Sequence, residues 1–291
     1  MKTVTTFAEA LRLAINHYRN GNYPQAEIIL RKLSEVKPGH KLVTDNLIQA
    51  IFDQGRTAEA LALYDQAVDG GAYACDADYD AVYRAALLAT RNCPAPLKRR
   101  IKYYTLLGLL TRALALEGDT AECGCYRGLS SYLMLSRIGM HEPGFTGGGY
   151  HIFDSFQGLS APTNQDEVGD DHPNADSLRY MCSPGRFSAP LEEVKQALSP
   201  FPGIDYHPGW IPFLFQGLME RDYRFVHLDV DLHEPTRACL EYFYPRMTRN
   251  GIIVCDDYGW PGARLALEEY CGREGAGYTV TEHAQAVIVC S

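Results

Sequence analysis

The sequence predicts an α/β protein: a mostly parallel sheet with helices on both faces, preceded by a small all-helical domain. Two observations predict this architecture. The N-terminal part of the 291 residues contains only helical patterns, and from Gly118 onward short apolar runs alternate with helical patterns. Strands that alternate with helices are joined by crossovers and therefore pair in parallel. The Pro-containing segment 92–96 separates the two parts, which predicts a helical domain at 1–93 and an α/β domain at 94–291.

The helical domain contains an internal repeat. Gly21 and Gly55 lie 34 residues apart, and the same spacing relates Ala26 to Ala60. This is the period of the tetratricopeptide repeat (TPR), a pair of antiparallel helices, which the region resembles in spacing. Such repeats bury their apolar faces against neighbours, so two of them leave faces uncovered. We therefore expect a homo-oligomer or a protein partner at the N-terminal helices; the alternative is a helical pair that only packs on the rest of the chain.

The α/β domain is expected to begin with a helix over 97–116, after another helix over 76–90. The expected strands are 121–126, 150–156, 203–208, 224–230 and 251–258. The expected helices between and after them are 127–139, 191–198, 210–219, 234–247 and 262–271. The last segments, 277–283 and 286–291, fit a closing antiparallel hairpin. Because such sheets bind ligands beyond the carboxyl ends of their strands, the residues that follow each strand are the candidates for chemistry.

Composition narrows the function classes. The net charge of −9 argues against binding a nucleic acid, because neutralising phosphates needs a basic face. No apolar run approaches the roughly 20 residues that span a bilayer, and the N-terminal residues lack the apolar core of a signal peptide. We therefore expect a cytoplasmic protein with a small-molecule substrate. The nine cysteines are scattered through apolar stretches, which indicates reduced, buried thiols, and Cys123 and Cys125 lack the spacing and the second pair of a zinc site.

The loop after the first strand is the first candidate binding element. Glu122 precedes Gly124 and Gly128, whose lack of a side chain would let a ligand approach the backbone. The pattern is not the G-x-G-x-x-G of dinucleotide-binding enzymes. An acid in front of the glycines suits a ligand with a cationic amino-acid portion and no phosphate.

The second and third strands end in further candidates for the same ligand. Asp154 closes the second strand, where an acid is well placed to accept hydrogen bonds from a ribose diol, and Ser155 and Phe156 follow it. Trp210 follows the third strand and could stack on an adenine, or it could be a core residue. Together with Glu122, these residues favour S-adenosylmethionine as the ligand.

Four carboxylates follow the fourth and fifth strands. Asp229 and Asp231 end one strand, and Asp256 and Asp257 end the next. In a partly desolvated cleft they would repel one another, so a cation must compensate them. All-oxygen ligands select a hard cation, most simply Mg²⁺. The alternative is that some of these acids cap the following helices, which is plausible for one of them but not for four.

These motifs resemble one enzyme family. The runs ECGCYRGLSSYLM, FDSFQGL, HPGW, HLDVDLHEPT and GIIVCDDY look like the macrocin and mycinamicin O-methyltransferases, which methylate sugar hydroxyls in macrolide biosynthesis, and the match covers most of 100–291 in order. The resemblance implies a class I methyltransferase fold, which is Rossmann-like, with S-adenosylmethionine as donor and Mg²⁺ as cofactor.

The resemblance also implies roles for the acids. Asp231, Asp256 and Asp257 match the positions of the metal ligands, and Asp229 lies beside the donor. The chain departs from the family where His233 stands in place of the usual tyrosine, and the TPR-like region is not part of the common pattern. Both departures leave the acceptor open: a sugar hydroxyl, a vicinal diol, a catechol or a hydroxylated peptide side chain would suit the same metal site.

Methyl transfer to a hydroxyl requires alignment of the acceptor and removal of its proton. His172, in a polar loop expected to cover the site, is the first candidate base, followed by His233 and Asp231. Two competing functions are an oxidoreductase that uses a nicotinamide cofactor and a non-catalytic adaptor with TPR-type helices. The missing pyrophosphate fingerprint disfavours the first, and the intact acidic cluster disfavours the second.

Overall fold

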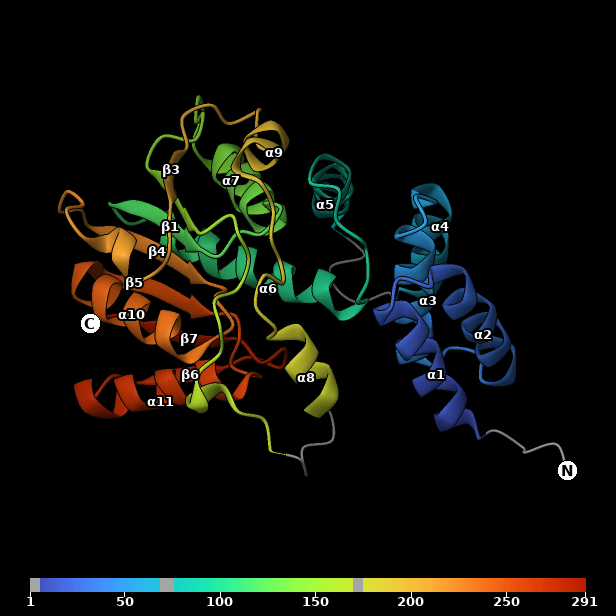
Figure 1. The fold of residues 1–291 in the computed structure, drawn as a ribbon. Coiled ribbons are helices and arrows are strands. Elements are labelled where there is room, and N and C mark those ends of the chain that lie inside the picture. Colours follow the sequence, from blue (N-terminus) through green and yellow to red (C-terminus); the bar gives the residue numbers. More distant parts are fainter. Residues whose placement is uncertain (1–5, 69–75, 170–174) are drawn as a thin grey trace, which may run out of the picture. The chain divides into compact units, whose positions relative to one another are not determined.

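The computed structural model describes residues 6–68, 76–169 and 175–291, which form two compact units (Figure 1). The first unit comprises Met1–Ile101 and the second Lys102–Ser291, and each is described by itself. Helix α6 (Lys98–Ala113) contributes its first residues to one unit and the remainder to the other. The boundary predicted at residue 93 stays a prediction.

Only helices occur among the described residues of the first unit. They form the hairpins expected from the repeat, with bounds α1 (Phe7–Arg19), α2 (Tyr23–Val36), α3 (Lys41–Phe52), α4 (Thr57–Ala67) and α5 (Ala77–Ala89). Gly21 connects α1 to α2 with a φ of +74°, and Gly55 connects α3 to α4 with a φ of +80°. The left-handed region is accessible to glycine without steric cost, which explains glycine at both turns.

Equivalent positions of the two hairpins have equivalent environments. Ala26 and Ala60 are both fully buried, so the small side chains stand where helices pack closely. The carboxylate of Glu27 in the first hairpin forms an ion pair with the guanidinium of Arg56 at 2.7 Å, which ties α2 to the turn before α4. The all-helical prediction is therefore confirmed, while membership of the TPR family remains a proposal.

The second unit contains a seven-stranded sheet in the order β3-β2-β1-β4-β5-β7-β6 (Figure 1). The strands are β1 (Asp119–Cys123), β2 (Tyr150–Asp154), β3 (Asp205–Pro208), β4 (Tyr223–Leu228), β5 (Met247–Cys255), β6 (Tyr278–Val280) and β7 (Ala286–Val289). The first five pair in parallel, and β7 runs antiparallel between β5 and β6. This confirms the mostly parallel sheet and the closing hairpin.

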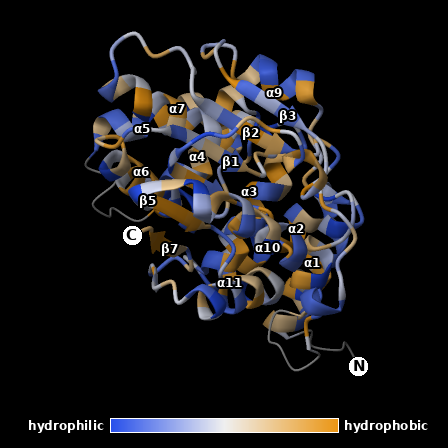
Figure 2. Ribbon diagram, turned by 90° about the vertical axis from the view of Figure 1, so that its left-hand side faces the viewer, coloured by the Kyte–Doolittle hydropathy of each residue, from blue (hydrophilic) through white to orange (hydrophobic). Residues whose placement is uncertain are grey.

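Helices cover both faces of the sheet, with α7 on one side and α10 and α11 on the other (Figure 1). Their bounds are α7 (Leu129–His141), α8 (Ala175–Met181), α9 (Leu191–Ala197), α10 (His233–Phe243) and α11 (Pro261–Glu274). Figure 2 shows both hydrophobic and hydrophilic residues along α7, α10 and α11, as expected for helices with one face on a sheet. The helix expected over 210–219 is wrong. Only a 3₁₀ turn, η3 (Phe213–Phe215), forms there, and Gly217, with a φ of +76°, leaves the helical region shortly after it.

The core of the second unit lies between the sheet and α10 with α11. Phe153, Tyr223, Phe243 and Ile253 are almost completely buried there. The eight cysteines in the described chain are free and buried, and Cys75 lies outside it. Across the described ranges, no helix combines the length and the apolar character needed to cross a membrane.

Candidate active site

The loop after β1 is held against the loop after β4. The amide of Asp229 donates to the carbonyl of Cys123 at 2.9 Å. Gly124 has a φ of +79°, and a Cβ at this position would lie 1.9 Å from the carbonyl oxygen of Asp229. Gly124 is therefore required for the close approach of these two loops. Gly128, with a φ of +84°, is the N-cap of α7.

Asp154 shapes the same loop from the end of β2. One carboxylate oxygen accepts the amide of Cys125 at 2.7 Å and that of Tyr126 at 3.3 Å, and the other accepts the amide of Phe156 at 2.7 Å. Burial raises the pKa of Asp154 even though these amides favour the ionised form. The side chain of Cys125 is a further hydrogen-bond partner of this carboxylate. The predicted ribose contact of Asp154 stays a prediction.

The other residues predicted to contact the donor are Ser155, Phe156 and Trp210. Ser155 donates its hydroxyl to the carbonyl of Gly158 at 2.9 Å, and Phe156 is buried with a φ of +56°. Trp210 is half-buried just beyond β3. These residues surround the ends of β1, β2 and β3, but their contact with a donor stays a prediction.

Glu122 lies inside the sheet rather than at its edge. It is fully buried, and its carboxylate accepts hydrogen bonds from Ser131 and, at 3.0 Å, from the hydroxyl of Tyr150. The Nδ1 atom of His227 lies 3.0 Å from its other oxygen. Direct contact of Glu122 with the donor stays a prediction, and the described contacts give it the role of anchoring α7 and His227 to β1.

The four acids meet at one edge of the sheet, as predicted. Leu228 of β4 pairs with Cys255 of β5, so the residues that follow the two strands are neighbours. Carboxylate oxygens of Asp229, Asp231 and Asp257 all lie within 4.8 Å of one another. Asp231 has a φ of +59°, a conformation that costs energy outside glycine, and its amide donates to the carboxylate of Asp257 at 2.9 Å.

Burial and mutual repulsion raise the pKa values of three of these acids. The pKa of Asp231 is raised to about 8, first by burial and then by the charge of Asp229. The pKa values of Asp229 and Asp257 are also raised well above their ordinary range by burial and by neighbouring carboxylates. Raised pKa values are the expected sign of carboxylates that lack enough positive charge around them.

Asp256 has a different environment. Its carboxylate lies 2.5 Å from the Nζ atom of Lys102 and accepts the side-chain amide of Gln285 at 2.8 Å. Burial would raise the pKa of Asp256, but the charges of Lys102 and His227 outweigh burial and hold that pKa below its ordinary value. Burial would lower the pKa of Lys102, but the charges of Asp256, Asp257 and Asp229 raise it above its ordinary value.

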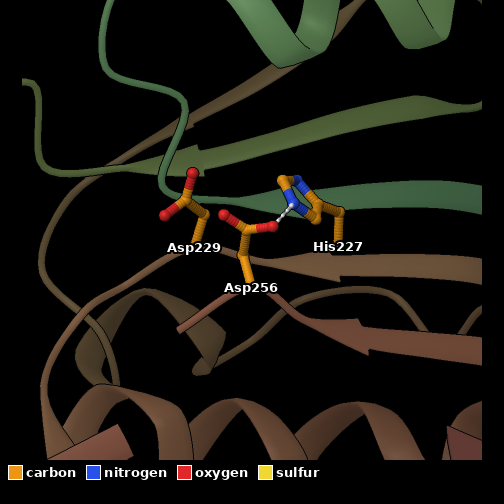
Figure 3. Close-up of side chains that lie close together, drawn as sticks. All are labelled: His227, Asp229 and Asp256. Atoms are coloured by element: carbon orange, nitrogen blue, oxygen red, sulfur yellow. Dashed lines mark ion pairs between the residues drawn. The ribbon is translucent and has the colours of Figure 1, made fainter. Parts of the chain in front are cut away.

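His227 connects Asp256 to Glu122. Its ring lies in the sheet with Nε2 3.6 Å from a carboxylate oxygen of Asp256, and Figure 3 shows the ring directed at that carboxylate with Asp229 beside it. Burial would lower the pKa of His227, but hydrogen bonding and charge from Asp256 and Glu122 raise it to about 10.

The sequence analysis missed Lys102, His227 and Gln285. Lys102 belongs to α6, which is distant in sequence from the four acids. The residue pattern of α6 gives no sign of the contact between Lys102 and Asp256. His227 could have been predicted. It stands near the end of β4, two residues before Asp229, and side chains two residues apart in an extended chain lie on the same face.

The candidate bases are dispersed. His172 lies outside the described residues. His233 begins α10 and is buried, and its Nε2 atom lies 3.1 Å from the carboxylate of Glu269 on α11. Asp231 is the candidate base that belongs to the acidic cluster.

A cavity of about 620 Å³ lies in the segment after β2. Its lining residues are Pro162, Thr163, Asn164, Asp166, Glu167, Val168, Gly169, Arg179 and Cys182. Asp166 anchors this segment because it accepts the amide of His233 at the start of α10 at 2.7 Å. This hydrogen bond ties the lining of the cavity to the loop after β4 that carries Asp231. Burial, and after it the charges of Asp231, Asp166 and Asp257, raises the pKa of Cys182 in that lining to about 12. Its size is that of a small-molecule site.

Comparison with known proteins agrees with this geometry. The sequence profile of the family described as Macrocin-O-methyltransferase (TylF) matches residues 107–283, more than half of the chain. The chain belongs to this family. The matched range contains the loop after β1, the end of β2 and all four acids. The resemblance stated from the sequence is therefore confirmed.

Three curated relatives are similar over the same part of the chain. The 8-demethyl-8-(2,3-dimethoxy-alpha-L-rhamnosyl)-tetracenomycin-C 4'-O-methyltransferase of Streptomyces olivaceus is 31% identical over 172 residues, 57% of this chain and 63% of the relative. Mycinamicin III 3''-O-methyltransferase of Micromonospora griseorubida is 25% identical, over 57% and 65%. Demethyldecarbamoylnovobiocin O-methyltransferase of Streptomyces niveus is 28% identical, over 53% and 58%. The chain thus spans less than two thirds of the length of these relatives.

Two solved structures share the fold. The O-methyltransferase NovP matches with a TM-score of 0.52 and 20% identity, over 67% of this chain and 80% of its own. The calicheamicin methyltransferase CalS11 matches with a TM-score of 0.51 and 22% identity, over 73% and 93%. The methyltransferase-like fold predicted for the second unit is confirmed by these similarities.

The close approach of the two loops generates a prediction for Gly124→Ala. The added methyl group would collide with the carbonyl of Asp229, and alanine at a positive φ costs a further 1 to 2 kcal/mol or so. We expect a lower melting temperature together with loss of S-adenosylhomocysteine binding in calorimetry. The control is Gly272→Ala in α11, where nothing lies within 4 Å of the new Cβ. If both variants melt and bind alike, the loop packing does not form the donor site.

Proposed function

We propose that the protein transfers the methyl group of S-adenosylmethionine to a hydroxyl oxygen of a small molecule, with a sugar hydroxyl of a glycosylated natural product as the favoured acceptor. The observation that carries the proposal is the family match across the acidic cluster and the loop packed against it. All three relatives are named as O-methyltransferases, and the name of the first includes a rhamnosyl group. The packing of the loop after β1 against the acidic cluster would bring the methyl donor and the acceptor side by side.

The donor site of this proposal lies at the ends of β1, β2 and β3. Asp154, at the end of β2, would bind the ribose, and Trp210 would cover the adenine. Gly124 and Gly128 would leave the backbone open to the amino-acid portion, with Glu122 supplying negative charge behind them. A dinucleotide is less well supported, because the loop lacks the glycine pattern that places a pyrophosphate on a helix N-terminus.

The metal of the proposal is Mg²⁺. The residues present fit such an ion: three carboxylates whose oxygens lie within 4.8 Å of one another have raised pKa values, which indicates uncompensated negative charge. The predicted ligands Asp231, Asp256 and Asp257 would hold the ion, together with Asp229, which belongs to both groups of closely spaced ligand atoms. When bound, Mg²⁺ lowers the pKa of a coordinated hydroxyl and fixes its position.

The acceptor would occupy the cavity beside the cluster. Thr163, Asn164 and Glu167 line it and could bind sugar hydroxyls, and Arg179 lies at its wall. The acceptor oxygen would form a bond to the methyl carbon as the bond from that carbon to sulfur breaks, and the hydroxyl proton would pass to His172, His233 or Asp231. The segment 162–169, which Asp166 ties to the start of α10, would exclude water from the acceptor.

The test of this function combines labelled donor with metal removal. We expect mass transfer from isotopically labelled S-adenosylmethionine to a glycosylated acceptor, complete loss of turnover in EDTA, and recovery with added Mg²⁺. Binding of S-adenosylhomocysteine should persist in EDTA, since Asp154 and the glycine loop would hold the donor independently of the metal.

Three results would argue against the proposal in different ways. Full turnover after exhaustive EDTA dialysis would remove the metal but keep the methyltransferase. A thermal shift with NAD and none with S-adenosylhomocysteine would favour the oxidoreductase. A shift with S-adenosylhomocysteine but no labelled product from any acceptor extract would favour the adaptor with a non-catalytic donor-binding domain.

We propose in addition that the TPR-like helices mediate self-association. Ile28 of α2 and Leu42 of α3 are about half exposed, as expected for repeats whose outer faces need a neighbour. Sedimentation velocity should detect a dimer or larger assembly that Ile28→Glu with Leu42→Glu shifts toward monomer. Met140→Glu, at a comparably exposed residue of α7, is the matched control. A chain that is monomeric at all concentrations would contradict self-association.

A further inference from the structure

Helix α6 belongs to both units, and two of its residues, Arg100 and Lys102, form ion pairs in different units. Arg100 belongs to the first unit, where its guanidinium lies 2.5 Å from the carboxylate of Asp80 on α5. Lys102 belongs to the second unit, where its ammonium lies 2.5 Å from the carboxylate of Asp256. Successive residues of an α-helix are rotated by about 100°, so side chains two positions apart leave the helix in nearly opposite directions. One turn of α6 therefore carries both contacts.

Arg100 fixes this turn within the first unit. Its side chain is deeply buried, and its guanidinium lies over the rings of Tyr79 and Tyr83, 5.9 Å and 5.6 Å from their centroids. The hydroxyl of Tyr79 donates to the backbone carbonyl of Arg100. A cation buried in this way needs its carboxylate partner, because removal of that partner leaves an uncompensated charge away from water. Asp80 therefore keeps Arg100, and with it the backbone of α6, in place.

Asp45 of α3 stabilises the start of the same helix. Its carboxylate accepts the amide of Leu97, the residue before α6, at 2.7 Å. The first amides of a helix lack partners within the helix, so an acceptor at this position opposes fraying of the first turn. Lys102 depends on that turn, because an α-helix bonds each amide to the carbonyl four residues earlier, which for Lys102 is that of Lys98.

Lys102 brings positive charge to the acidic cluster. Burial raises the pKa values of Asp229, Asp231 and Asp257, and the charge of Lys102 acts against that rise. The ammonium can lie only where its four-carbon stem reaches, so its place among the acids depends on the position of the backbone of α6. The contacts in the first unit that fix the first turn of α6 thus bear on the charge at the ends of β4 and β5.

We propose that the ion pair between Asp80 and Arg100 positions Lys102 in the proposed methyltransferase site: it fixes the first turn of α6 and thereby holds the ammonium against the acidic cluster. Asp80 and Arg100 are then positioning residues, and the helical unit acts on the chemistry of the second unit through the charge of one side chain. This inference rests on the proposed function, because the acids that Lys102 compensates are those that would bind the metal and the acceptor.

The experiment measures how fast Lys102 of the full-length protein is acetylated by an N-hydroxysuccinimide ester of acetate, followed by mass spectrometry of its peptides. In the wild type the ion-paired Lys102 should react slowly, and the exposed Lys32 of α2 is the internal reference. Asp80→Asn leaves Arg100 without its charged partner. Acetylation of Lys102 should then accelerate on the order of tenfold relative to Lys32, because the contact with Asp256 opens more often.

Three variants separate positioning from a general loss of structure. Asp80→Glu keeps the charge and should keep Lys102 protected. Asp65→Asn removes an ion pair with Arg84 at 2.7 Å in the same unit without touching α6, and it should leave Lys102 as slow as in the wild type. Asp256→Asn removes the partner of Lys102 directly and gives the rate of the released side chain.

A second substitution keeps the test decisive if circular dichroism shows that Asp80→Asn does not fold. Asp45→Ala removes the acceptor of the amide of Leu97 and frees the start of α6 by a different route. It should also accelerate the acetylation of Lys102 relative to Lys32.

Two results would overturn the inference. Continued protection of Lys102 in both variants that disturb the first turn would show that α6 is held by its later residues alone, such as the fully buried Leu106. A wild type in which Lys102 reacts as fast as Lys32 would remove the contact that the ion pair is inferred to position. Both results leave methyl transfer intact, since failure of the proposed function appears instead in the experiment with labelled donor.

Discussion

Repulsion among buried carboxylates is the constraint on which the rest of the site depends. The parallel pairing of β4 with β5 brings Asp229, Asp231 and Asp257 within a few ångströms of one another, in a place where burial raises their pKa values. Such a cluster is unfavourable unless positive charge accompanies it. The fold supplies part of that charge from Lys102 and His227, both of which face Asp256. Lys102 also acts to lower the pKa values of Asp229, Asp231 and Asp257, but burial and the neighbouring carboxylates outweigh it, and this imbalance supports a divalent ion there.

The same network connects the acids to the loop after β1. Glu122 of β1 binds His227 of β4, and His227 faces Asp256 at the end of β5. Beyond the carboxyl ends of β1 and β4, Gly124 lies against the backbone of Asp229. Three neighbouring strands are thus cross-linked by buried charge and by close backbone packing. Donor and acceptor sites built on these strands would keep a fixed separation, which methyl transfer between two bound molecules requires.

Much of this arrangement could be predicted from the sequence, because it follows from local patterns. Alternating strands and helices predict the parallel sheet, and acids that end adjacent parallel strands must meet. The helix expected over 210–219 does not form: the apolar spacing predicted it, but Gly217 adopts a positive φ that a helix does not have. The contact of Lys102 with Asp256 depends on tertiary packing of α6, to which no local pattern points. The donor contacts, the metal ligands and the base His172 remain predictions.

The most direct test of the central claim is the melting temperature as a function of Mg²⁺ concentration. An ion that relieves the repulsion binds the folded state and stabilises it, so the melting temperature should rise with Mg²⁺ by on the order of 5 °C at saturation. Asp257→Asn removes one charge but keeps an oxygen to accept the amide of Asp231. It should melt higher than the wild type in EDTA and respond less to Mg²⁺. A wild type that ignores Mg²⁺, with an Asp257→Asn variant that melts lower in EDTA, would contradict the account and identify the acids as structural caps.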